Sequence, residues 1–255
     1  MEQFHNIKNR KGNDKMENII EITNLTKIYK NKIKALENIN LTINKGEKVT
    51  IFGPNGAGKT TLIKTIGMFI IPDRGKIKIK GYDTQKEEKK IKKMITISTA
   101  NERSFYYRLS LEENLKFFGM LNNITGKELK KKVEKGLKEM GLYENRKIKY
   151  MEASTGMKRR LNLARALIKE AEIYLLDEPT NGVDIETKIK IYEIMEELSQ
   201  KGKTIILASH EVSEIEKTDR IIVLKKGKVV ADKKTEEILK KTTKENEERL
   251  LELIK

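Results

Sequence analysis

The segment GPNGAGKTT at residues 53–61 constrains the fold of this chain more than any other. It has the spacing glycine, four residues, glycine, lysine and threonine, with the apolar run KVTIF before it and an amphipathic pattern after it. This is the arrangement of a P-loop, a phosphate-binding turn between a strand and a helix. A glycine turn that merely precedes a helix is the alternative. We favour a nucleotide site because the strand and helix patterns are both in place.

The residue types of this loop predict their roles. Glycines let backbone N–H groups face inward around phosphates, and the helix N-terminus adds partial positive charge. Lys59 is expected to reach the β- and γ-phosphates, and the hydroxyl of Thr60 is expected to bind Mg²⁺. The residues predicted to surround the nucleotide phosphates are Gly53, Pro54, Asn55, Gly56, Ala57, Gly58, Lys59, Thr60 and Thr61.

Two carboxylates, Asp177 and Glu178, follow the apolar run IYLL at 173–176. Because side chains alternate along a strand, we expect the two carboxylates to point to opposite sides. Asp177 suits the water shell of Mg²⁺, and Glu178 suits polarising a water for attack on a γ-phosphate. Acidic residues also end strands and cap helices, but the P-loop in the same chain favours the catalytic interpretation.

Short apolar runs of the strand type recur along the chain with helical patterns between several of them. The runs are INLTI (39–43), KVTIF (48–52), KIKIK (76–80), MITIS (94–98), IYLL (173–176), TIILA (204–208) and RIIVL (220–224). After IYLL, apolar residues recur at helical spacing at Ile185, Ile189, Tyr192, Met195 and Leu198. Strands that alternate with helices predict an α/β fold with a largely parallel core sheet.

The alternation breaks over about residues 101–170, where the patterns predict helices at 111–121, 126–140 and 156–169. We interpret this stretch as a helical subdomain inserted into one domain that spans 19–255. Residues 1–18 are polar and lack periodicity, so we expect a disordered tail.

Composition narrows the classes of partner. The net charge of +16 is compatible with nucleic acid, an anionic membrane surface or phosphorylated ligands, but the lysines are spread along the whole chain. A solvated lysine-rich surface is therefore the favoured interpretation. The chain has no cysteine, which excludes disulfides and thiol chemistry. No apolar run approaches the roughly 20 residues of a membrane-spanning helix, so we expect a soluble, cytoplasmic protein whose membrane role would need a partner.

Four segments in this order, GPNGAGKTT, ASTGM, LLDEPTNGVD and ASH, resemble the ATP-binding subunits of ABC transporters. The resemblance runs from about Ile19 to the C-terminus. It is specific because other P-loop ATPases lack an element like ASTGM between the P-loop and the acidic pair. It implies a P-loop NTPase core with a mostly parallel sheet, an N-terminal antiparallel β region and an inserted helical subdomain.

The resemblance also implies a site shared between two subunits. ASTGM matches the family signature, so Ser154 and the backbone at Gly156 would contact the γ-phosphate of ATP held by the facing subunit, in accord with anion binding at a helix N-terminus. Asp184, in NGVD, matches the loop that contacts the opposite subunit; alone it would simply be a helix N-cap. Two chains would complete two sites, as a homodimer or as a heterodimer with a homologous subunit.

Three further residues take roles by the same resemblance. Tyr29 lies where the family stacks an aromatic ring on adenine, although it could be an ordinary strand aromatic. His210 matches the switch histidine that contacts the γ-phosphate. Asn101 falls where the family has a glutamine that touches Mg²⁺ and the attacking water. Asparagine keeps the amide but is one methylene shorter, so it would act through a bridging water.

A cluster of aromatic residues suggests where a partner docks. The cluster is Phe105, Tyr106, Tyr107, Phe117 and Phe118. Aromatic residues concentrate at interface cores, and the resemblance implies a groove here that receives a cytoplasmic helix of a membrane subunit. The core of the helical subdomain is the alternative for part of the cluster. We expect Phe105, Tyr106 and Tyr107 to be exposed.

The resemblance implies an ATP- and Mg²⁺-dependent ATPase that powers a membrane permease from the inner face of the cell membrane. Met157 replaces the usual glutamine of the signature, which resembles the exporter branch and favours export. A soluble relative that acts in translation or DNA repair is the alternative, although such proteins carry tandem domains, coiled coils or zinc sites. We expect no nucleic acid partner. A general P-loop kinase or GTPase is disfavoured by ASTGM and by the place of His210.

Overall fold

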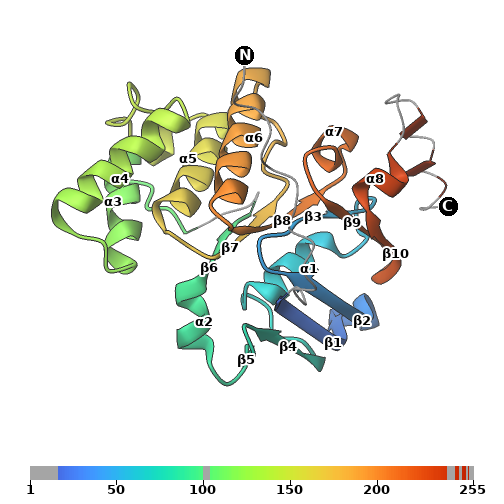
Figure 1. The fold of residues 1–255 in the computed structure, drawn as a ribbon. Helices are drawn as coiled ribbons and strands as arrows, with labels where there is room; N and C mark the ends of the chain where they lie inside the picture. The colour runs from blue at the N-terminus through green and yellow to red at the C-terminus, as the bar shows by residue number, and fades with distance from the viewer. Residues whose placement is uncertain (1–16, 100–103, 240–244, 247–248, 251, 253–255) are drawn as a thin grey trace, which may run out of the picture.

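The computed structural model describes residues 17–99, 104–239, 245–246, 249–250 and 252. Two sheets meet in this part of the chain, and helices of the central segment gather on one side, away from the antiparallel strands β1, β2 and β4 (Figure 1). The mixed α/β fold with a mostly parallel sheet confirms the fold class predicted from the sequence.

The larger sheet has the strand order β10-β9-β3-β8-β7-β6. Its strands are β3 (Lys48–Phe52), β6 (Ile95–Ser98), β7 (Ile173–Asp177), β8 (Thr204–Ser209), β9 (Arg220–Lys225) and β10 (Lys228–Lys234). The pairs of β3 with β8 and β9, of β7 with β8 and of β6 with β7 are parallel, and β10 pairs with β9 antiparallel. Parallel pairing brings the carboxyl ends of β3, β7 and β8 to one edge, where the loops that follow them meet.

Both faces of this sheet are covered, which explains the continuous apolar runs of its strands. Leu175 of β7 belongs to the hydrophobic cluster that includes β3 and the P-loop helix, whereas Tyr174 and Leu176 belong to the cluster under the central helices. Every residue of β7 and β8 is buried.

The smaller sheet is antiparallel, in the order β2-β1-β4-β5. Its strands are β1 (Asn18–Tyr29), β2 (Ile33–Asn44), β4 (Arg74–Ile79) and β5 (Tyr82–Asp83). Asn18, which the sequence analysis assigned to the tail, pairs with Asn44 as the first residue of β1. Residues 1–16 lie outside the described part of the chain.

The helices largely follow the sequence patterns. They are α1 (Lys59–Ile66), α2 (Glu88–Met94), α3 (Leu111–Leu121), α4 (Gly126–Glu139), α5 (Thr155–Ile168), α6 (Ile185–Gln200), α7 (Val212–Ile215) and α8 (Thr235–Ile238), with 3-10 turns at Lys30–Lys32 and Tyr150–Glu152. The helix expected at 111–121 is confirmed without change, and the other two differ by one residue at their ends. Ser110 and Glu113 form a reciprocal capping box that fixes the start of α3.

One expectation about the aromatic cluster is wrong. Phe105 is only 3% exposed, because its ring stacks on Tyr150 at 5.0 Å and meets Phe118 edge-on at 5.3 Å. Tyr106 and Tyr107 are 50% and 60% exposed, as expected. The ring of Phe105 is therefore buried in the core under the central helices, whereas the side chains of Tyr106 and Tyr107 are exposed.

No helix in the described residues is long and apolar enough to cross a membrane.

Candidate nucleotide site

The P-loop follows β3 and has a conformation that requires its glycines. Gly53 and Gly58 have φ angles of +158° and +107°. A Cβ atom at Gly53 would lie 2.3 Å from the carbonyl oxygen of Leu224, and one at Gly58 would lie 2.4 Å from that of Ala35. The loop is therefore held tightly against β9 and β2, and side chains at these two positions would displace it.

Lys59 begins α1 and lies inside the loop. Its side chain is 5% exposed, and its Nζ donates hydrogen bonds to the carbonyl oxygens of Gly53 at 2.7 Å and Pro54 at 3.2 Å. Burial lowers the pKa of Lys59, while the nearby Glu178 and Asp177 act to raise it. A buried ammonium group held by neutral carbonyls can exchange them for phosphate oxygens, with a gain in charge complementarity.

The residues expected to hold Mg²⁺ are in contact with each other. Thr60 Oγ1 donates a hydrogen bond of 2.9 Å to Asp177 Oδ1. Asp177 is 4% exposed, and burial raises the pKa of its carboxyl. Mg²⁺ prefers oxygen ligands and takes one or two carboxylates together with substrate phosphates. A hydroxyl and a carboxylate beside a phosphate-binding loop fit that requirement.

The carboxylates of Asp177 and Glu178 do not point to opposite sides as expected. The alternation ends with β7 at Asp177, and Glu178 has a φ of +50°, in the left-handed region. Glu178 Oε1 lies 4.0 Å from Nζ of Lys59. Lys59 directly precedes Thr60, whose hydroxyl bonds Asp177. Both carboxylates therefore face the P-loop and the start of α1.

Glu178 makes contacts on both carboxylate oxygens. Its Oε1 lies 3.3 Å from Nδ1 of His210, which follows β8, and its Oε2 accepts a hydrogen bond of 3.0 Å from Asn181 Nδ2. The backbone N–H of Glu178 donates to the carbonyl of Ala208 at 2.9 Å, which ties the loop to β8. The structure thus brings His210 to Glu178, and it adds Asn181, which the sequence analysis missed. The sequence could have indicated this contact, since Asn181 lies only three residues after Glu178 in LLDEPTNGVD.

Tyr29 lies at the end of β1 beside the P-loop helix. Its hydroxyl is 3.5 Å from Thr61 Oγ1, and the residue is 42% exposed. An exposed ring next to the phosphate loop can stack on a planar base.

Two expected residues cap helices. Ser154 is exposed and its Oγ accepts a hydrogen bond of 3.2 Å from the N–H of Met157 at the start of α5, beside the half-buried Gly156. Asp184 accepts hydrogen bonds from the N–H and Oγ1 of Thr187 at 2.8 and 2.9 Å at the start of α6. Among the described residues, no hydrogen bond or ion pair connects Ser154 with the P-loop. Asn101 lies outside the described residues.

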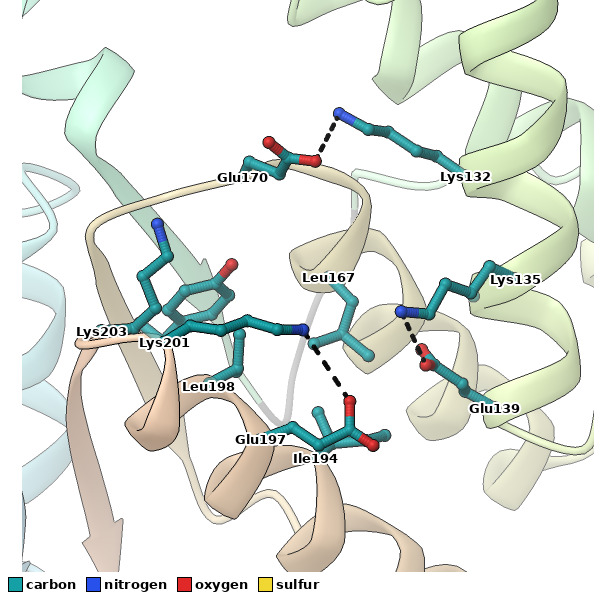
Figure 2. Close-up of a pocket in the computed structure, with 12 residues that line it drawn as sticks. Lys132, Lys135, Glu139, Leu167, Glu170, Ile194, Glu197, Leu198, Lys201 and Lys203 are labelled. Atoms are coloured by element: carbon teal, nitrogen blue, oxygen red, sulfur yellow. Dashed lines mark ion pairs between the residues drawn. The ribbon is translucent and has the colours of Figure 1, made fainter.

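Two of the hollows in the described part of the chain have contrasting linings, and both lie away from the P-loop. A cleft of about 460 Å³ between α4, α6 and the loop before β8 has charged walls (Figure 2). The ion pair Lys132–Glu170 joins α4 to the segment after α5, whereas Lys135–Glu139 and Lys201–Glu197 each join residues four apart in the chain. A groove of about 810 Å³ is lined by α3 and the edge strand β6. Phe69 and Leu121, both 64% exposed, lie at this groove. The groove combines apolar side chains with a strongly basic lining of Lys92, Lys93, Lys132, Arg165 and Lys169, whereas most charged side chains of the cleft are paired with each other.

Comparisons with known proteins agree on one family. The family model described as ABC transporter matches residues 36–181. The ABC transporter ATP-binding protein NatA of Bacillus subtilis is 35% identical over 218 residues, which cover 83% of this chain and 88% of that protein. The linearmycin resistance ATP-binding protein LnrL of the same organism is 36% identical, over 84% of this chain and 68% of that protein.

A solved structure agrees as well. A dimeric ATP-binding cassette in a post-hydrolysis state, bound to ADP and Pi, superposes with a TM-score of 0.78 at 30% identity, covering 85% of this chain and 98% of that one.

Proposed function

Because the chain belongs to the ABC transporter family as an ATP-binding subunit with ATPase activity, we propose that it powers export of a substrate through a partner membrane permease. The proposal rests on the observation that five side chains of the predicted site lie together at the carboxyl edge of the parallel sheet. They are Lys59, Thr60, Asp177, Glu178 and His210. These are the groups that phosphoryl transfer to water requires: phosphate-binding donors, oxygen ligands for a metal ion and a base.

The nucleotide would lie along the P-loop. Backbone N–H groups of residues 53–61 and the ammonium of Lys59 hold its phosphates, and Tyr29 stacks on its base. Thr60 and Asp177 hold Mg²⁺, which neutralises charge on the phosphates when bound. In this reading the hydrogen bond between Thr60 and Asp177 pre-orients two of the oxygen ligands.

Glu178 is the proposed general base. Its Oε2 accepts a hydrogen bond from Asn181, and its Oε1 lies toward His210 and Lys59, so we assign the polarising of the water to Oε1, on the side of the phosphate-binding groups. His210, 43% exposed as a side chain, positions the γ-phosphate next to that water. Asn101 is proposed to assist there, on the resemblance alone.

The exposed helix starts support a dimeric site. Ser154 and Gly156 present the N-terminus of α5 to the outside, and such a terminus attracts an anion. We propose that it meets the γ-phosphate of ATP in a facing subunit, that Asp184 contacts that subunit, and that ATP closes the dimer. The dimeric relative with ADP and Pi supports this assembly. Homodimer and heterodimer both satisfy it.

The groove beside α3 and β6 is the proposed docking place for a helix of the permease. Its lining combines exposed apolar side chains, among them Phe69 and Leu121, with basic side chains that include Arg165 and Lys169. The protein would then be cytoplasmic and peripheral on the inner face of the membrane. Export is favoured by Met157 in the signature and by LnrL, whose name records linearmycin resistance.

The decisive experiment is affinity purification of tagged Glu178→Gln protein from detergent-solubilised membranes with ATP, followed by mass spectrometry. A multi-spanning membrane protein in stoichiometric amount is the expected result. Ribosomes or nucleic acid, with nothing from the membrane fraction, would overturn the proposal in favour of a soluble ATPase. The same purification with Lys59→Ala protein is the matched control for ATP dependence.

A further inference from the structure

The start of α5 is connected to Glu178 within one chain. Arg159 Nη1, in the second turn of α5, donates a hydrogen bond of 2.5 Å to the backbone carbonyl of Asn181. The side chain of the same Asn181 donates through Nδ2 to Glu178 Oε2 at 3.0 Å. Two hydrogen bonds thus lead from the helix that Ser154 caps to the carboxylate of the proposed base.

Gly182 makes room for the arginine. Its φ is +66°, and a Cβ atom built on it would lie 1.6 Å from Nη1 of Arg159 and 2.8 Å from the guanidinium carbon. The guanidinium therefore approaches the turn that carries Asn181 closely with its Nη1 end. No other residue type would leave that space, so the fit between Arg159 and the turn depends on glycine at this position.

The turn is held on its other side as well. Thr180 donates a hydrogen bond from its hydroxyl to Glu214 of α7, and both residues are 1% exposed. The turn between Glu178 and Asp184 is therefore anchored to α7 at Thr180 and to α5 at Asn181. A shift of α5 relative to α7 would therefore move Asn181 relative to Thr180. The side chain of Asn181, which contacts Glu178, would move with it.

We propose that Arg159 and Asn181 are positioning residues that make the orientation of the Glu178 carboxylate depend on the place of α5. This inference rests on the proposed function, in which the N-terminus of α5 receives the nucleotide of the facing subunit. Binding there moves or steadies α5, and Arg159 transfers that change to the carbonyl of Asn181. The amide of Asn181 then holds Oε2 so that Oε1 is directed at the water.

The hydrogen-bond chemistry suits this task. A guanidinium is a planar donor with a fixed geometry, so its bond to one carbonyl restrains direction as well as distance. A misplacement of about 1 Å at a reacting group can cost on the order of 100-fold in rate. Loss of the contact is therefore expected to lower the turnover number with little effect on nucleotide affinity.

The test measures kcat and KM for ATP in Arg159→Ala, Arg159→Lys and Asn181→Ala proteins. We expect kcat to fall by roughly tenfold or more in Arg159→Ala and Asn181→Ala, with KM within about twofold of wild type. Arg159→Lys should recover part of the rate, because an ammonium can still donate to the carbonyl. Lys158→Ala is the control, since Lys158 lies over the Tyr150 ring at 5.2 Å and should leave kcat unchanged.

A double variant separates positioning from general loss of structure. If both residues act through Glu178, Arg159→Ala combined with Asn181→Ala should lose no more rate than the worse single variant. ATP-dependent dimerisation of each variant in the Glu178→Gln background should match that of Glu178→Gln alone. Additive losses, lost dimerisation or an unchanged kcat in Arg159→Ala would each overturn the inference while leaving the proposed function intact. A folded wild-type protein without ATPase activity would instead refute the proposed function, and this inference with it.

Discussion

Thr60 and Asp177, 117 residues apart in the chain, are joined by a hydrogen bond of 2.9 Å between Oγ1 and Oδ1. The bond connects the first turn of α1 to the end of β7, two strands away from β3 in the sheet. It shows that the phosphate loop and the acidic pair form one site. Asp177 is buried, and its partner in this bond is the neutral hydroxyl of Thr60. We therefore expect the charge of Asp177 to matter most when Mg²⁺ is present.

Asp177→Asn should separate metal binding from nucleotide binding. Asparagine can still accept the hydrogen bond from Thr60, so the loop should keep its shape, but the site loses the charge that attracts a cation. We expect ATP affinity without Mg²⁺ to stay within about twofold and the Mg²⁺ concentration for half-maximal hydrolysis to rise by roughly tenfold or more. Titration of ATPase activity with Mg²⁺ measures this, and an unchanged midpoint would contradict the assignment of Asp177.

Lys59→Ala should weaken nucleotide binding strongly. The variant removes a buried ammonium group whose hydrogen bonds to phosphate are worth roughly 1.5–3 kcal/mol, so we expect a loss of at least 10- to 100-fold in ATP affinity. Equilibrium titration with a fluorescent ATP analogue measures it. Lys78→Ala, an exposed lysine on β4, is the matched control and should bind like wild type. Equal affinities for the two variants would show that the phosphates lie elsewhere.

Glu178→Gln should trap the ATP-bound state. Glutamine keeps the size of the side chain and can accept the bond from Asn181, but it cannot act as a base. A general base contributes roughly 10²- to 10⁴-fold, so hydrolysis should fall by that amount while ATP still binds. Size-exclusion chromatography with ATP should show a stable dimer. Hydrolysis at the wild-type rate would mean that another group is the base.

Ser154→Arg should bind ATP and remain monomeric. Ser154 is exposed at the start of α5, so a long side chain there fits the monomer but blocks a phosphate from the helix N-terminus. The lost N-cap should cost about 1 kcal/mol of stability. Ser154→Ala loses the cap without adding bulk and serves as the control for that cost. A dimer formed by Ser154→Arg with ATP would exclude α5 from the subunit interface.

Glu214→Gln should change how stability depends on pH. Burial raises the pKa of Glu214 above its ordinary value of 4.5, with Glu211 adding to the rise, while Ser209, Thr180 and Lys188 oppose it. The folded protein therefore holds this proton more tightly than the unfolded chain. The stability that Glu214 contributes is full below pH 4.5 and is lost as the pH rises through the raised folded-state pKa.

Glutamine does not titrate, so Glu214→Gln should gain stability relative to wild type as the pH rises. Urea unfolding of both proteins at pH 5 and pH 8 measures the difference. A relative loss of stability at the higher pH would show that the carboxylate form is the one the fold prefers.

Several parts of the site were predictable because they are local. The glycine spacing of GPNGAGKTT specifies a turn that other residues cannot adopt, and the apolar run before it specifies a buried strand. In the same way, Ser110 and Glu113, which form a capping box within four residues, indicate the start of α3. These patterns act over one turn or one strand, where backbone sterics and hydrogen bonds decide the outcome without help from distant segments.

Other parts were not predictable because they depend on where elements come together. Phe105 and Tyr106 are neighbouring aromatic residues, yet Tyr150, more than 40 residues on, covers the first and leaves the second exposed. The direction of Glu178 follows from its left-handed backbone, a conformation that the alternation rule does not anticipate for a glutamate.

The sequence by itself determined which residues form the phosphate loop, the acidic pair and the helix starts, because short-range sterics and hydrophobic periodicity encode them. Only the tertiary structure decided that both carboxylates face the loop, that His210 and Asn181 share the two oxygens of Glu178, and that Arg159 of α5 lies against Gly182. These contacts arise at the edge where the carboxyl ends of parallel strands converge. Packing on both faces of the sheet selects the order of its strands. That order brings distant residues to this edge.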